Sequence, residues 1–133
     1  MKKFRIPGQL TSLNEYTSAC RSNKYTGARI KKREETVIRH SIRYQCLGYR
    51  FTVPVYVRFL WVCKDSRKDR DNIAFAKKFI LDAMVDERLI ADDGWNSVLG
   101  FMDDFAIDKD CPHIEVEVYR EDEWPFKSTS QQI

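Results

Sequence analysis

The chain has 133 residues and a net charge of +3, with 43% hydrophobic and 32% charged residues. That length fits one domain, and the composition excludes a disordered chain, which has low hydrophobicity and high net charge. The longest apolar-rich run, Val53 to Cys63, contains a proline and an arginine and is too short to cross a bilayer. Few apolar residues follow Met1, so no secretory leader is visible. We therefore expect one domain over residues 1–133, in the cytoplasm and away from membranes.

The charges are unevenly distributed along the chain. Residues 1–50 hold 12 Lys/Arg and 3 Asp/Glu, a net charge of +9, whereas residues 51–133 hold 11 and 17, a net charge of −6. A basic half suits a polyanion such as DNA, and an acidic half suits divalent cations. Solvated surface residues explain the same distribution, so charge by itself leaves both interpretations open.

The cysteines and histidines are too scattered in sequence to predict a metal site. A zinc site typically uses closely spaced thiolates and imidazoles. Here these residues are Cys20, His40, Cys46, Cys63, Cys111 and His113. Four reduced thiols are therefore expected.

The N-terminal half predicts one short strand and then helix. Residues 3–6 alternate between polar and apolar side chains, which is typical of a strand. Ser12 and Glu15 have the spacing of a capping box, so a helix should begin there. Helical spacing continues to about Leu47, and Gly27 is a candidate break between two helices.

The C-terminal half mixes strands with one helix. In order it predicts a strand at 51–62, a polar loop at 64–70, a helix from Asp71 or Asn72 to about residue 85, a short strand at 98–101, a clear strand at 113–119 and a flexible tail from about residue 121. Strands and helices do not alternate regularly. We therefore expect an α+β domain, with a mixed or mostly antiparallel sheet and helices packed on one face.

Two pairs of aspartates are the candidate metal ligands. Asp69 and Asp71 lie two positions apart, so in an extended segment their side chains point the same way and can share one cation. Asp92 and Asp93 follow the next helix, which rises about 20 Å. The roughly seven residues after that helix can fold back along it, so the two pairs can meet. Ordinary helix capping explains an Asp-x-Asp motif equally well.

These carboxylates suit magnesium, which prefers hard oxygen ligands and keeps several of its waters. Hydrolysis of a phosphodiester needs an activated water and positive charge at the transition state, and bound Mg²⁺, or Mn²⁺ in its place, supplies both. A nearby lysine adds to that charge, and Lys77 and Lys78 are the candidates. The EF-hand and the glycine-rich phosphate loop are excluded, because neither pattern is present.

The order of these motifs resembles the RusA family of Holliday junction resolvases, which prophages often carry. The matching parts cover roughly residues 4 to 120, and their combined order is more specific than any one of them. They are Ser12-Leu13-Asn14-Glu15-Tyr16, Lys68-Asp69-Arg70-Asp71-Asn72, Lys78, Asp82-Ala83-Met84, Asp92-Asp93, Gly100–Phe105 and Ile114–Val118.

The resemblance implies a magnesium-dependent, structure-selective endodeoxyribonuclease that cuts four-way DNA junctions in recombination and repair. By position, the metal ligands would be Asp69, Asp71, Asp92 and Asp93, and the catalytic residues would be Asp69, Asp71, Asp93 and Lys78, with Lys77 as an alternative lysine. Asp82 is expected to be structural. Family members act as homodimers, so a bacterial or phage-encoded homodimer is expected here, with Val53 to Val62 as a candidate dimer surface.

Several polar and aromatic residues are candidates for DNA contacts. Those nearest the acidic motif are Lys68, Arg70, Asn72 and Lys77, and a further cluster on the first half of the chain contains Lys31, Lys32 and Arg33. A solvated helix explains that cluster equally well. Four aromatic residues are candidates for stacking on unpaired bases, although such side chains more often belong to a core: Tyr25, Tyr44, Tyr49 and Trp95.

Two other functions remain open. One is a module that binds branched DNA without cutting it, and the other is a metal-dependent phosphatase acting on small molecules. Carboxylates more than about 10 Å apart would favour the binding module, because the ligands of one magnesium ion lie within about 2.1 Å of it. A narrow pocket without a basic groove would favour the phosphatase.

Overall fold

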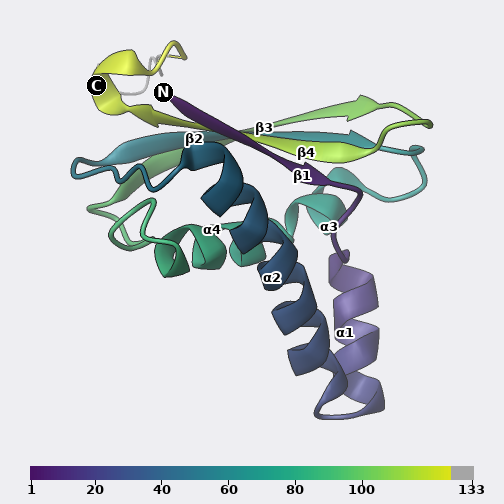
Figure 1. The fold of residues 1–133 in the computed structure, drawn as a ribbon. Coiled ribbons are helices and arrows are strands. Elements are labelled where there is room, and N and C mark those ends of the chain that lie inside the picture. The colour runs from purple at the N-terminus through teal and green to yellow at the C-terminus, as the bar shows by residue number, and fades with distance from the viewer. Residues whose placement is uncertain (127–133) are drawn as a thin grey trace.

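Residues 1–126 are described by the computed structural model shown in Figure 1. In chain order its elements are β1 (Lys2–Pro7), α1 (Leu13–Ser22), α2 (Thr26–Cys46), β2 (Val55–Cys63), α3 (Arg70–Ala74), α4 (Lys77–Asp86), β3 (Val98–Ile107), β4 (His113–Arg120) and the short 3₁₀ helix η1 (Glu121–Glu123). Within this described range, every helix is too short or too polar to span a bilayer.

The four strands form one mixed sheet in the order β1-β4-β2-β3. Strand β4 is antiparallel to both β1 and β2, whereas β2 and β3 are parallel. The parallel pair follows from the connection, because α3 and α4 carry the chain back to the starting end of β2. Figure 1 shows α2 and α4 on the same side of the sheet. The prediction of an α+β domain with a mixed sheet is therefore confirmed.

Alternating side chains of the central strands build the core between sheet and helices. In β2, residues 55, 57, 59 and 61 are buried, and residues 56, 58 and 60 between them are partly exposed. Strand β4 repeats this pattern, as its sequence predicted. The side chains that close the core from the helices are Ile38 and Ile42 of α2 and Phe79, Ile80, Ala83 and Met84 of α4. Each of these side chains except the small Ala83 contributes roughly 1.5–3 kcal/mol through burial, which holds both helices in place.

The predicted helical region of the first half is a hairpin of α1 and α2. The helices separate at residues 23–25, and Gly27 lies inside the first turn of α2. A Cβ atom at Gly27 would overlap the Sγ of Cys20, so glycine leaves room for that side chain where the two helices meet. The end of α2 is as predicted, with Leu47 and Gly48 in the left-handed conformation.

The helix predicted after the polar loop is divided into α3 and α4. Asp69, rather than Asp71 or Asn72, occupies the N-cap position of α3. Its backbone is extended, with φ −69° and ψ 152°, and its carbonyl accepts the N–H of Ile73 at 3.1 Å. Asp71 therefore lies within the first helical turn, two positions beyond the extended segment's end.

Two strands differ from prediction at their ends. Strand β2 begins at Val55 and not at residue 51, because Pro54 has no N–H to donate to a strand neighbour. Strand β3 continues to Ile107 instead of ending near Phe101, since it pairs along the whole length of β2. The longer β3 supplies one wall of the candidate site described below.

The beginning of the predicted tail is packed against the sheet. The ring of Trp124 stacks on Tyr56 at a centroid distance of 4.9 Å. The N-terminal ammonium of Met1 lies 2.8 Å from the carboxylate of Glu123. The rest of the tail expected to be flexible, residues 127–133, lies outside the described residues.

Candidate active site

Asp69 and Asp71 line an open hollow of about 600 Å³, which we call the Asp71 hollow. The loop after β2, the start of α3 and the end of β3 surround it. Its polar lining residues are Asp65, Ser66, Lys68, Asp69, Arg70 and Asp71. Asp65 is an addition to the predicted site, and its one signal in the sequence is its place in the polar loop before the motif. Three carboxylates and two cations therefore border one space.

The carboxylates of Asp69 and Asp71 form no ion pair within the described residues. Asp71 accepts the backbone N–H of Asn72 at 2.9 Å, and Asp69 makes no side-chain bond to its own helix. Arg70 instead lies over the ring of Phe105, with its guanidinium carbon 5.6 Å from the centroid. Most oxygen lone pairs of the two aspartates are thus left for a ligand from solution.

The N-terminus of α1 holds both sides of the loop that carries these aspartates. Lys68 donates to the carboxylate of Glu15 at 2.9 Å, and the amide oxygen of Asn72 accepts the backbone N–H of Asn14 at 2.9 Å. The backbone N–H of Ser12, and then Lys68, lower the pKa of Glu15 to about 2. Lys68 and Asn72, predicted as DNA contacts, therefore also position the loop.

Asp93 reaches the first half of α4, so the chain folds back along that helix as its sequence required. The return begins where the N–H of Leu89 donates to the carbonyl of Met84 at 2.9 Å. It brings the carboxylate of Asp93 to 3.4 Å from the Nζ of Lys78. Asp92 faces its own turn and accepts the N–H of Gly94 at 2.8 Å. Asp93 is thus the member of this pair that meets a predicted catalytic lysine.

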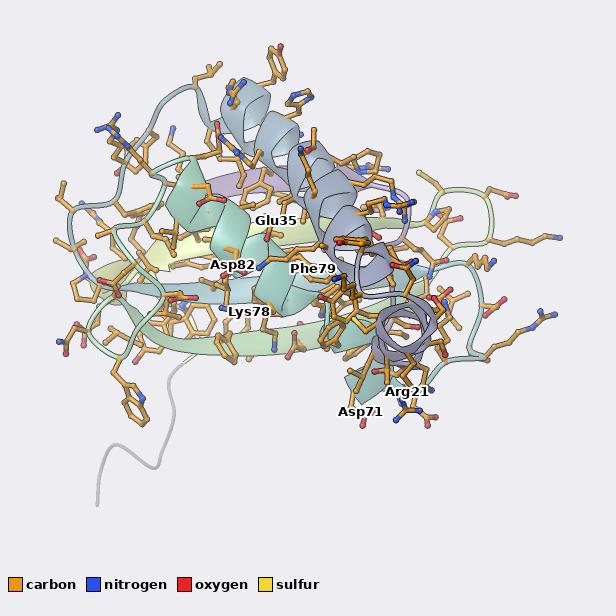
Figure 2. The ribbon with its side chains drawn as sticks, turned by 90° about the horizontal axis from the view of Figure 1, so that it is seen from below. Arg21, Glu35, Asp71, Lys78, Phe79 and Asp82 are labelled. Atoms are coloured by element: carbon orange, nitrogen blue, oxygen red, sulfur yellow. The ribbon has the colours of Figure 1, made fainter. Side chains whose placement is uncertain are left out.

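A second hollow, of about 260 Å³, lies beside Asp93 between α2 and α4, and we call it the Asp93 hollow. Asp82 bridges it, because its carboxylate lies 2.9 Å from Lys78 and 3.5 Å from Lys31. Glu35 also lines it, with one carboxylate oxygen buried and without a hydrogen-bond partner. Burial raises the pKa of Glu35. Figure 2 shows Glu35, Asp82 and Lys78 grouped at this junction of the two helices.

The structure distinguishes the two candidate lysines. Lys78 is 61% exposed and contacts Asp82 and Asp93, and its hydrogen bond with Asp82 is the main cause that raises its pKa. Lys77 is 16% exposed and donates to Asp103 of β3 at 2.6 Å. The Lys77 ammonium also lies 4.2 Å from the centroid of the Phe101 ring. Lys78 is therefore the lysine beside a predicted acid, and Lys77 ties α4 to the sheet.

In a single copy of the chain, Asp69 and Asp71 line one hollow and Asp93 lines another, whereas Asp92 lines neither of the two. The hollow of Asp69 and Asp71 is bordered by the end of β3, whereas the hollow of Asp93 lies between α2 and α4. In Figure 2, Asp71 lies apart from the group formed by Lys78 and Asp82. Within residues 1–126, no three His, Cys, Asp or Glu side chains come close enough together to hold a metal ion. The four predicted ligands are therefore not assembled around one point.

A pair of carboxylates is nevertheless a suitable start for a magnesium site. Magnesium in phosphate-handling proteins is usually held by one or two carboxylates, substrate phosphates and its own waters. Asp69 and Asp71 provide two carboxylates without ion-pair partners at the rim of an open space. Asp93 fits less directly, because Lys78 already balances part of its charge.

Basic residues continue from the Asp71 hollow toward α2. Arg33, Lys64 and Lys68 line an adjoining hollow of about 270 Å³, the Arg33 hollow, together with Glu15 and Glu34. Lys68 lines both hollows and so connects them. Positive charge thus lies next to the aspartates, as a polyanion with a metal-bound phosphate requires.

Some of the other basic residues of α2 are exposed without an ion pair among the described residues, and others form ion pairs within the chain. Lys32, like Arg33, is exposed. Lys31 instead pairs with Asp82, and Arg39 and Arg43 both bind Glu87, at 2.8 and 3.0 Å. Only part of the predicted basic cluster is therefore available to a ligand without breaking an ion pair.

The four aromatic residues singled out in the sequence are all on the surface: Tyr25, Tyr44, Tyr49 and Trp95. Trp95 has the greatest exposure, at 95%. The alternative that these four side chains belong to the core is therefore wrong.

A scan of the chain against models of protein families finds no match, and a search of curated proteins finds none either. The resemblance to the RusA family therefore remains a prediction from the order of the motifs.

Proposed function

We propose that the protein is a magnesium-dependent endonuclease that cuts branched DNA, with the four-way Holliday junction as its substrate. The observation that carries the proposal is the Asp71 hollow, where two carboxylates without ion-pair partners lie next to a surface bearing Lys68 and Arg33. The loop that holds these groups is fixed on both sides by α1. The order of motifs shared with the RusA family supports the same function.

The candidate site residues have different roles in this proposal. Asp69 and Asp71 would hold Mg²⁺, and Asp65 lines the same hollow. The bound ion supplies an activated water and balances the charge that develops on the phosphate. Lys78 stays protonated because of its acidic neighbours, so it contributes positive charge and does not act as a base. Asp92 and Asp93 are ligands proposed from the sequence, and both lie outside the lining of the Asp71 hollow.

We also propose that two copies of the chain act together, since a junction offers two equivalent strands to cut. Strand β2, within the surface expected from the sequence, is central in the sheet and has both edges paired. Strand β3 is the better candidate, because it is an edge strand of ten residues without lysine or proline, the residues that most often protect a strand edge from pairing. Its two charged residues, Asp103 and Asp104, both form ion pairs within the chain.

The proposal is tested by cleavage of a synthetic four-way junction and of a linear duplex with the same arm sequences. We expect cutting of the junction in Mg²⁺ and no cutting in EDTA or of the duplex. Loss of cutting in Asp71→Asn with intact junction binding supports the assignment. Junction cutting in EDTA, or binding without cutting in any divalent metal, contradicts it.

One observation favours a second candidate, a module that binds junctions without cutting. It is the separation of Asp93 from Asp69 and Asp71, which line a different hollow. Tight junction binding combined with no cleavage in Mg²⁺ or Mn²⁺ would establish that function. The open, basic-flanked shape of the Asp71 hollow does not favour a small-molecule phosphatase.

A further inference from the structure

Trp95 is the most exposed of the large apolar side chains that the structure describes. The other two tryptophans differ from it, since Trp61 is 1% exposed and Trp124 is partly buried against Tyr56. An indole ring has a large apolar surface, which gains free energy when it leaves water. A single exposed apolar residue is common on proteins, so its meaning depends on how the residue is held and what surrounds it.

The turn that carries Trp95 is held by hydrogen bonds on both sides. Before it, the N–H of Gly94 donates to the side chain of Asp92 at 2.8 Å. After it, the N–H groups of Ser97 and Val98 donate to the carbonyl of Gly94 at 3.1 and 2.9 Å. The carbonyl of Ser97 then accepts the N–H of Val55, which joins the turn to the sheet. The indole is thus presented from a backbone with little freedom to withdraw it.

The residues around Trp95 indicate which kind of molecule the exposed ring could bind. Asp93 lies two residues before Trp95 and is bound to Lys78, whose ammonium is 61% exposed. A membrane surface would need several neighbouring apolar residues, and within 91–97 the one large apolar side chain is Trp95 itself. A single exposed aromatic ring is instead a feature with which proteins hold single-stranded nucleic acid, where the ring stacks on a base.

We propose that Trp95 stacks on an unpaired base at the branch point of the DNA and so selects branched over linear substrates. This inference rests on the proposed function and assigns the recognition of branching to a residue outside the metal site. Fully paired duplex has no free base face, so the stacking contributes only where the junction opens.

Binding measurements in EDTA test the stacking without cleavage. Stacking of one base contributes about 1–3 kcal/mol, so Trp95→Ala should weaken junction binding about ten-fold or more. Trp95→Phe keeps a ring and should lose much less, and both variants should bind linear duplex like the unchanged protein. Equal junction affinity in all three proteins would overturn the inference.

Tryptophan fluorescence reports the contact directly, because Trp61 is buried and Trp95 is the exposed indole. Adding junction DNA should quench the long-wavelength side of the tryptophan emission and should protect the Trp95 ring from quenching by acrylamide. Trp95→Phe should remove both effects. Junction binding without any change in this emission would overturn the stacking and leave the proposed function intact. If Trp95 is already shielded from acrylamide in the free protein, it belongs to a protein interface and the inference fails. Absence of all DNA binding would instead reject the proposed function, and this inference with it.

Discussion

At the scale of single residues, the ion pairs separate two groups of acidic side chains. Asp82, Asp93, Asp103 and Glu87 each contact a lysine or arginine. Asp69 and Asp71, by contrast, form no ion pair within the described residues. Carboxylates near one another without cations repel, and a fold tolerates this mainly where a bound cation offsets it. Asp69 and Asp71, which line one hollow and form no ion pair in the described part of the chain, are therefore the residues to test first.

Replacing Asp71 with asparagine should reduce junction cleavage about 10²–10³-fold, because the metal loses one charged ligand. Junction binding should be unchanged or tighter, since one negative charge facing the phosphates is removed. Single-turnover cleavage and binding in EDTA measure the two effects separately. The matched control is Asp122→Asn, because Asp122 lies beyond β4, at the end of the sheet where β2 begins. Near-normal cleavage by Asp71→Asn would remove its catalytic assignment.

Asp82 and Asp93 should respond differently to the same change to asparagine. Asp82 joins α2 to α4 through Lys31 and Lys78, so Asp82→Asn should cost up to about 1 kcal/mol of stability and change cleavage only a few-fold. Asp93→Asn should reduce cleavage by orders of magnitude with little loss of stability. Urea unfolding and cleavage rates of the two variants provide the comparison. Equal cleavage by both would argue against a role for Asp93 in the reaction.

At the scale of elements, the N-terminus of α1 stabilises the loop that leads into Asp69. Glu15 closes the capping box with Ser12 and also binds Lys68 of the loop. The same carboxylate therefore starts a helix and fixes the segment that leads into Asp69. Loss of this contact is expected to act on both the stability of α1 and the position of the loop.

The contribution of Glu15 should depend on pH. Its pKa falls from 4.5 to about 2 on folding, so the stabilisation is complete above about pH 4.5 and is lost as pH falls toward 2. At pH 7, Glu15→Gln should be less stable than the unchanged protein, by under about 1 kcal/mol because the side chain is exposed. Near pH 2 the two should be equal. Urea unfolding midpoints of the two proteins at both pH values measure this difference in stability. A difference that persists at pH 2 would mean that the lowered pKa of Glu15 is not its cause.

The exposed basic residues of α2 should determine how DNA affinity depends on salt. Lys32 and Arg33 are the positions to change, since reversing Lys31 would also break its ion pair with Asp82. The double change to glutamate should weaken binding to every DNA and reduce the slope of log affinity against log salt by about two. The double change to glutamine serves as a graded control with a smaller effect on affinity. An unchanged slope would mean that this face does not contact DNA.

At the scale of the whole molecule, β3 is the longer of the two edge strands in the described sheet, and we propose its outer edge as the surface for a second copy. We expect sedimentation at micromolar concentration to give twice the chain mass of 15.8 kDa. Ile107→Lys, at an exposed position at the end of β3, should shift the protein toward monomer because a charged edge resists pairing. A monomer with and without DNA would rule out the proposed homodimer, and a dimer unaffected by the lysine would place the interface elsewhere.

Local features of the sequence were sufficient to predict most of the elements. The capping box at Ser12, the alternation in residues 113–119 and the polar loop before Asp69 each depend on a few neighbouring residues. The periods of helix and strand are properties of the backbone itself, so they are visible without knowledge of the fold. The α+β class and the position of Asp69 and Asp71 at a helix start followed from these patterns.

The arrangement of the candidate site was decided only by tertiary packing. Burial of Phe79, Ile80 and Met84 orients α4 so that Lys78 faces α2 and Lys77 faces the sheet, and adjacent positions in the sequence gave no sign of that difference. The same packing brings Asp93 to Lys78 and keeps it in a different hollow from Asp71. Contacts between distant segments depend on how whole helices and strands fill the core, which no local pattern encodes.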